Sequence, residues 1–212
     1  MDILLINPGL SVSERYGKAL GKVGPTTEPL GLAYLASSIR KDRDDYIKIL
    51  DLEAMKLDKS GLIKVLEGNE WNVIGIMILT PTYLNSQDVI KTVKENSKDS
   101  KIIVGGPHVT IFPEDTLKEN SEIDFGVVGE GEETIVELLY AIENEGSFDN
   151  INGIVYRTDS EIILTKPRDF IKNIDAIPLP ARDLLNMKLY KPAPTYYKRL
   201  PSHVMLTSRG CP

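Results

Sequence analysis

Five short apolar runs, separated by helix-length amphipathic segments, limit most strongly how this chain can fold. The runs are nearly continuous and rich in Ile and Val, which is typical of parallel strands covered by helices on both faces. They are Ile3–Ile6, Ile47–Leu50, Val73–Leu79, Ile102–Val104 and Phe125–Val128. The helical segments are Pro29–Lys41, Ser60–Glu67, Ser86–Ser97, Pro113–Asn120 and Glu132–Glu145. This alternation predicts a doubly wound, five-stranded parallel sheet in a three-layer α/β/α fold of the Rossmann-like or flavodoxin-like class.

The pattern changes after Gly146. Gly153–Arg157 and Glu161–Leu164 alternate in hydropathy around a polar turn, which predicts a β-hairpin. An irregular proline-containing segment follows, with Pro178, Pro180, Pro192, Pro194 and Pro201. We therefore expect a domain over residues 1–147, followed over residues 148–212 by a hairpin and a linker.

Composition excludes several classes of protein. The 25 basic and 31 acidic residues give a net charge of −6, which argues against a nucleic-acid-binding face. No apolar run approaches the roughly 18 residues that a membrane span needs. The first residues resemble a buried strand rather than a signal peptide. Because Cys211 is the single cysteine, a disulfide framework is excluded, and we expect a cytoplasmic location.

Ligands of open α/β sheets bind beyond the carboxyl ends of the strands, where helix N-termini favour anions and polar groups. Each strand-end loop here is small, glycine-rich or hydroxylated, and four such loops at one sheet edge predict a binding cleft. The candidate cofactor-binding residues are Asn7, Pro8 and Gly9 after the first strand, Thr80, Pro81 and Thr82 after the third, Gly105, Gly106, Pro107 and His108 after the fourth, and Gly129, Glu130, Gly131 and Glu132 after the fifth.

Several of these residues have more than one interpretation. His108 could be a metal ligand, a general base or a polar residue that caps its loop. Glu130 and Glu132 could act as paired carboxylates, yet Glu132 and Glu133 also fit the first turn of a helix, where acids stabilise the dipole. Each glycine turn, taken alone, also fits a tight strand-to-helix connection that holds no ligand.

Five segments, in order, resemble the N-terminal cobalamin (B12)-binding domain of B12-dependent radical SAM proteins, a family often labelled magnesium-protoporphyrin IX monomethyl ester anaerobic cyclase. The resemblance covers nearly the whole chain and is specific as an ordered set. The segments are 103–110 with Pro113-Glu114, 124–134, 153–157, 175–182 and Thr207-Ser208-Arg209-Gly210-Cys211-Pro212.

The resemblance implies that the chain binds cobalamin, with the nucleotide tail between the sheet and its helices and the corrin over the strand-end loops. Many B12 domains carry D-x-H-x-x-G after the first strand, and its histidine ligates cobalt. Here Asn7-Pro8-Gly9 stands there, and no histidine precedes His108. The resemblance therefore implies base-off cobalamin without that ligand. We also expect Gly106→Leu to weaken corrinoid binding.

Cys211 matches the first cysteine of the family's C-x-x-x-C-x-x-C cluster motif, and the other two positions lie beyond this sequence. We expect this chain to be the non-catalytic, cofactor-binding part of a longer enzyme. That enzyme would use a [4Fe–4S] cluster and S-adenosylmethionine in its own radical SAM domain. The resemblance implies methyl transfer or ring-forming chemistry there.

Two alternatives come from other classes. A receiver-like regulatory module would need an acidic cluster after the first strand and an aspartate ending the third, where Asn7 and Thr80 stand. A flavin-binding module would need a hydroxyl-rich phosphate loop with flanking aromatics, for which Ser11, Ser13, Tyr16 and Tyr83 are the candidates. The chain alone could also lack affinity for its ligand, if the following domain forms half of the site.

Overall fold

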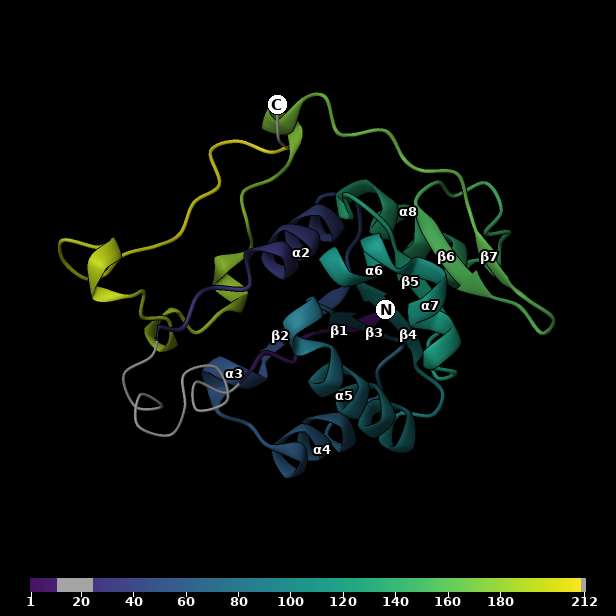
Figure 1. Cartoon of the computed structure of the whole chain (residues 1–212), viewed down its shortest axis with the longest axis horizontal. Helices are drawn as coiled ribbons and strands as arrows, with labels where there is room; N and C mark the ends of the chain where they lie inside the picture. Colours follow the sequence, from purple (N-terminus) through teal and green to yellow (C-terminus); the bar gives the residue numbers. More distant parts are fainter. Residues whose placement is uncertain (11–24, 211–212) are drawn as a thin grey trace.

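The structure is a computed structural model that describes residues 1–10 and 25–210. Over these residues the strands form one seven-stranded sheet in the order β2-β1-β3-β4-β5-β6-β7 (Figure 1). The strands are β1 (Asp2–Asn7), β2 (Tyr46–Asp51), β3 (Val73–Met77), β4 (Lys101–Gly105), β5 (Phe125–Val127), β6 (Ile154–Arg157) and β7 (Ile162–Leu164). The first five pair in parallel, which confirms the doubly wound α/β fold.

The sheet has seven strands rather than the five expected, because the predicted hairpin joins it. β6 pairs antiparallel with β5, Val127 lying opposite Ile154, and β7 pairs antiparallel with β6. A free edge of β5 would leave its backbone N–H and C=O groups unpaired, and the hairpin supplies partners for them. The predicted hairpin is therefore confirmed, and it extends the parallel sheet.

Helices cover both faces of the sheet, as the alternating sequence pattern predicts (Figure 1). They are α2 (Leu30–Asp42), α3 (Leu52–Met55), α4 (Lys59–Glu67), α5 (Tyr83–Asn96), α6 (Pro107–Ile111), α7 (Pro113–Glu119) and α8 (Glu132–Glu143). Short 3₁₀ turns are η1 (Thr80–Thr82), η2 (Ile174–Ala176), η3 (Arg182–Leu184), η4 (Met187–Leu189) and η5 (Pro194–Tyr196). Within residues 1–10 and 25–210, no helix is both long and apolar enough to cross a membrane.

Alternation along each strand divides the core into two layers. Ile3 and Leu5 of β1 pack on the side of α2 and α8, and Leu4 and Ile6 pack on the side of α4 and α5. All four side chains are at most 2% exposed. Because residues i and i+2 of a strand face the same side, side chains matched in register on β1, β3 and β4 face the same helices.

Part of the predicted linker belongs to the core. Ala181, Leu185 and Tyr190 are buried and pack with α2 and the sheet. The Tyr190 hydroxyl donates to Asp51 Oδ2 at 3.1 Å, at the end of β2. Burial raises the pKa of Asp51, and hydrogen bonds, including the one from Tyr190, oppose that shift. The linker therefore docks on the α/β body, while the division at residue 147 stays a prediction.

We expect Tyr190→Phe to lower the free energy of unfolding by about 1–3 kcal/mol, because the buried Asp51 carboxylate loses a donor. Urea unfolding of the purified chain measures this loss. Tyr196→Phe is the matched control, since Tyr196 is 83% exposed. Equal unfolding midpoints for the two variants would contradict the docked position of the linker.

Candidate functional site

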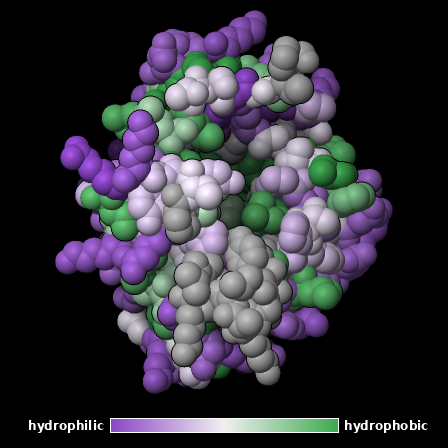
Figure 2. Space-filling view, turned by 60° about the vertical axis from the view of Figure 1, so that its left-hand side comes forward, coloured by the Kyte–Doolittle hydropathy of each residue, from purple (hydrophilic) through white to green (hydrophobic). Residues whose placement is uncertain are grey.

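A cavity of about 420 Å³ lies at the carboxyl end of the parallel strands, between the sheet and helices α2 and α8. Its floor is formed by Leu5 of β1, Gly75 of β3 and Ile103 of β4. The strand order reverses its winding between β1 and β3, so the cavity lies at the position where doubly wound sheets bind ligands. In the space-filling view this side of the molecule is hollowed, and hydrophobic residues lie inside the hollow (Figure 2).

Missing side chains create the space. Gly75 stands in register with Leu5 and Ile103 on the face toward α2 and α8. The Leu5 side chain lies over it, with Cδ2 2.7 Å from the position that a Gly75 Cβ would take. Gly105 lies two residues beyond Ile103 on the same face of β4, and a Cβ there would make only ordinary contacts, the nearest at 3.7 Å from Val127. On the opposite wall, Gly31 of α2 has nothing within 4 Å of a Cβ position. Because glycines stand on both walls, space is left between the sheet and the helices.

Six of the predicted residues line this cavity at its rim. They are Gly105, Gly106, Gly129, Glu130, Gly131 and Glu132. The two loops that carry them are joined, because the Gly129 amide donates to Thr110 Oγ1 at 3.1 Å. The structure thus brings the fourth-strand and fifth-strand loops together at one mouth.

Gly106 has a backbone that only glycine adopts without strain. Its φ is +106°, and a Cβ there would stand 2.8 Å from the Ile78 carbonyl oxygen. Substitution would therefore disturb the β4 turn as well as the cavity. Gly106→Leu cannot separate ligand binding from folding, whereas Gly31 and Gly105 offer open space for a larger side chain.

The end of the described chain covers the cavity through an ion pair. Leu206, Ser208, Arg209 and Gly210 line its outer side. The Arg209 guanidinium donates to Glu132 and lies 3.6 Å from Glu130 Oε1, with its Cζ 5.4 Å from the centre of the Tyr34 ring. Hydrogen bonding to Glu132 raises the pKa of Arg209. This pair fastens the covering segment to the start of α8.

A second anchor holds the same segment beside α2. The Glu28 carboxylate is buried and accepts from Arg182 Nε at 2.9 Å, while its other oxygen lies 3.2 Å from His203 Nδ1. Arg182 also donates to the Val204 carbonyl. One buried carboxylate thus ties both ends of the segment 182–204 and directs residues 206–210 over the cavity.

The other predicted residues lie at the same sheet edge but outside the cavity lining. Asn7, Pro8 and Gly9 are buried, and the Gly9 carbonyl accepts from Asn85 Nδ2 at 3.2 Å. Thr82 closes the η1 turn, donating to the Leu79 carbonyl at 3.0 Å and accepting from its amide at 3.2 Å. Thr80, Pro81 and Pro107 are exposed. Ser11, Ser13, Tyr16 and Cys211 lie outside the described residues.

His108 is on the opposite side of the sheet from the cavity. Its side chain is buried, its Nδ1 lies 3.2 Å from Thr80 Oγ1, and its ring centre lies 4.2 Å from that of Tyr83. Burial lowers the pKa of His108, and the Glu119 carboxylate partly opposes this shift. Over the residues described, no group of three or more His, Cys, Asp and Glu side chains could hold a metal ion. The geometry therefore favours the interpretation of His108 as a loop residue.

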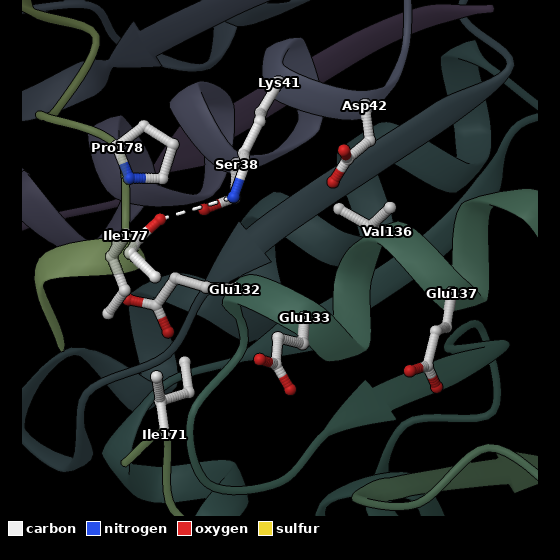
Figure 3. Close-up of a pocket in the computed structure, with 11 residues that line it drawn as sticks. Ser38, Lys41, Asp42, Glu132, Glu133, Val136, Glu137, Ile171, Ile177 and Pro178 are labelled. Atoms are coloured by element: carbon white, nitrogen blue, oxygen red, sulfur yellow. Dashed lines mark hydrogen bonds between the residues drawn. The ribbon is translucent and has the colours of Figure 1, made fainter. Parts of the chain in front are cut away.

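A second cavity, of about 320 Å³, lies between α2, α8 and the linker residues 171–178 (Figure 3). Lys41 crosses its edge and donates to the Ala176 carbonyl at 3.3 Å, the bond dashed in the figure. Of its acidic side chains, Glu133 and Glu137 are paired with Arg168. Glu132 lines both cavities. The carboxylates there mainly hold the linker and the hairpin end against α8.

Sequence reasoning missed Gly31, Gly75 and Arg209. A glycine inside an Ile- and Val-rich strand is a known sign of close approach, so Gly75 carried a usable signal. Gly31 in a helix segment carried a weaker one. Arg209 meets Glu132 across 77 positions, and no local pattern reports such a contact.

Comparison with known proteins decides the family. Residues 17–139 match the sequence model described as the B12 binding domain. The chain belongs to the B12-binding domain family. An uncharacterized methyltransferase, PH0819 of Pyrococcus horikoshii, is 37% identical over the whole chain, which spans 44% of that protein. The anaerobic magnesium-protoporphyrin IX monomethyl ester cyclase of Synechocystis is 29% identical, and the chain spans 41% of it.

Solved structures agree with this B12-binding domain in fold. The cobalamin-dependent S-adenosylmethionine radical enzyme OxsB, with aqua-cobalamin and S-adenosylmethionine bound, aligns over 87% of the chain and 24% of its own, at 23% identity and a TM-score of 0.68. The radical S-adenosylmethionine methyltransferase TsrM of Kitasatospora setae aligns over 79% and 30%, at 21% identity and a TM-score of 0.65. The resemblance stated from the sequence is thereby confirmed.

We expect the His108 imidazole of this B12-binding domain to titrate below its ordinary pKa of about 6.5, which an NMR pH titration measures. A lowered folded-state pKa means that the unfolded chain binds the proton more readily. Stability should therefore fall as the pH drops below the ordinary value towards the folded one. His108→Gln should remove this part of the pH dependence. If the unfolding free energy, measured with urea, changes equally with pH in the variant and the wild type between about pH 7.5 and 5.5, the expectation is wrong.

We expect Arg209→Ala to release the covering segment of the domain, because the substitution removes the ion pair with Glu130 and Glu132. The measurement is the NMR order parameter of the amides of residues 206–210, which should fall below about 0.6. Arg199→Ala, an exposed position in the same linker, is the control. Order parameters that stay equal in the two variants would show that the pair does not hold the segment.

Proposed function

We propose that this chain holds a cobamide with its nucleotide tail in the cavity beside α2 and α8 and its corrin over the strand-end loops. The observation that carries the proposal is an apolar cavity lined by glycines, with Gly105 and Gly106 at its mouth, in a member of the B12-binding domain family. Its volume of about 420 Å³ falls within the range of small-molecule sites, about 300–1,000 Å³.

The rim would hold the middle of the tail. Gly105, Gly106, Gly129 and Gly131 leave their backbones open to a ligand. The N-caps of α2 and α8 make no side-chain hydrogen bond, and both helices begin at this edge. In the first turn of α2, the Leu30 amide donates to the Glu28 carbonyl at 2.9 Å. Such helix starts favour a phosphodiester. Arg209 neutralises Glu130 and Glu132, whose charges would otherwise repel that group.

The strand-end loops would face the corrin. They are the loops of Asn7, Pro8 and Gly9, of Thr80, Pro81 and Thr82, and of Pro107 and His108. We propose a base-off form, since a base seated in the cavity is removed from cobalt. The two histidines of the chain also have partners, His108 at Thr80 and His203 at Glu28.

For the whole protein we propose a radical SAM enzyme that transfers methyl groups or closes a ring. The support is that the relatives include an uncharacterized methyltransferase and an anaerobic magnesium-protoporphyrin IX monomethyl ester cyclase, of which this chain spans less than half. Cys211 would then be the first ligand of a [4Fe–4S] cluster, and S-adenosylmethionine a second cofactor, in a following domain. Cobalamin supplies the methyl-transfer or radical chemistry, while this chain binds and orients it. We also propose a cytoplasmic location.

Titration of the purified chain with hydroxocobalamin, followed by visible spectroscopy, tests the proposal. We expect saturable binding with a base-off spectrum. Gly105→Leu and Gly31→Leu should each weaken binding by at least about tenfold, because the added side chain fills the cavity without a backbone clash. Gly146→Leu is the control, since a Cβ there meets only Ala141, at 3.8 Å, away from the cavity.

Three results would contradict the proposal. One is wild-type affinity in both cavity variants, which would place the ligand elsewhere. Another is a base-on spectrum at saturation, which would remove the base from the cavity. The third is selective binding of a flavin in place of the corrinoid, which would favour the flavodoxin-like alternative.

A further inference from the structure

The inner part of the cavity is apolar throughout. Its floor and walls are formed by apolar side chains, which include those of Leu5, Leu32, Leu35, Met77, Ile103, Val127 and Ile135. The polar side chains in the described lining are Glu130, Glu132, Ser208 and Arg209, and all of these lie at the rim or on the covering segment. Polar groups therefore meet a ligand at the mouth and not at the bottom.

The backbone at the bottom is already committed. Leu5, Gly75 and Ile103 lie in the middle of adjacent parallel strands, where N–H and C=O groups pair in the ladder. Over the residues described, Ser38 Oγ and Arg43 Nη1 are buried side-chain atoms without a hydrogen-bond partner, and neither residue lines this cavity. A ligand group at the floor would thus find neither a donor nor an acceptor.

The rim glutamates are also engaged. Glu130 Oε2 accepts from the Ile171 amide at 2.6 Å, and Glu132 accepts from Arg209. A polar base that reached the rim would compete with these bonds. The cavity therefore offers shape and apolar contact to a base, and little hydrogen bonding.

We propose that this cavity selects the lower base of the cobamide, accepting an apolar aromatic base and rejecting a purine. The inference rests on the proposed function, in which the base is the end of the tail and reaches the floor. A purine carries an amino group and several ring nitrogens that lose their water without replacement, which penalises its burial. Dimethylbenzimidazole or a phenol has far fewer such groups, so it loses less.

Affinities of the purified chain for four corrinoids test this inference. They are cobalamin, a cobamide with a p-cresol base, a cobamide with an adenine base, and cobinamide, which lacks the nucleotide. We expect the first two to bind with similar affinity and the adenine form at least about tenfold more weakly. Cobinamide should also bind more weakly than cobalamin, because it leaves the cavity unfilled.

The outcomes separate the two proposals. Equal binding of cobalamin and the adenine cobamide, with weaker cobinamide, would overturn base selection and leave the proposed function standing. Cobinamide binding as tightly as cobalamin would remove the tail from the cavity and overturn the selection with it. Absence of binding by all four would overturn both.

A substitution at the wall of the cavity gives an independent test of base selection. Met77→Gln keeps the side-chain length and adds an amide to the partly buried wall of the cavity. It should reduce the difference between the adenine and dimethylbenzimidazole forms by several-fold. Met55→Gln, at a 44% exposed position outside the lining, should leave that difference unchanged. Unchanged discrimination in both variants would overturn the assignment of selectivity to this wall.

Discussion

Parallel pairing of β3 between β1 and β4 is the constraint on which the site depends. It sets Gly75 beside Leu5 and Ile103, on the face that α2 and α8 cover. A slip of one residue would turn Gly75 to the other face and fill the space with Ile74 or Ile76. The ladder that stabilises the sheet therefore also determines where the cavity lies, and why its floor offers no free hydrogen-bonding group.

The covering segment connects this cavity to the chain that follows it. Glu28 and Glu132 are far apart in sequence, yet each pairs with an arginine of the C-terminal linker. Arg209 stands two positions before Cys211 in the sequence. A ligand that enters the cavity from its outer side must displace residues 206–210 or pass beside them. The position of this segment and the filling of the cavity are thus coupled through the pair at Glu132.

Local periodicity was enough to predict much of the fold. The Ile- and Val-rich runs gave the five parallel strands, and the alternation around Thr158 gave the hairpin. The attachment of β6 to β5 was missed, because edge pairing depends on tertiary placement. The same limit applies to Tyr190, whose burial against Asp51 comes from a proline-containing segment without periodic signal.

For the site, the glycine loops after β4 and β5 were predicted, since strand-end position and residue type suffice there. Which loop residues line the cavity and which lie on the opposite face of the sheet could not be predicted, because this depends on the direction of each side chain. His108 follows Gly106 by two residues, yet it packs against Tyr83 on the other side of the sheet. The role of Arg209 could not be predicted from the sequence, because its partners come from a different part of the chain.

The most direct test is a crystal structure of this chain grown with hydroxocobalamin. We expect the nucleotide between the sheet and helices α2 and α8, in contact with Gly105, with its base on Leu5 and Ile103 and away from cobalt. A base that remains coordinated to cobalt, with no part of the nucleotide between β4 and α8, would contradict it.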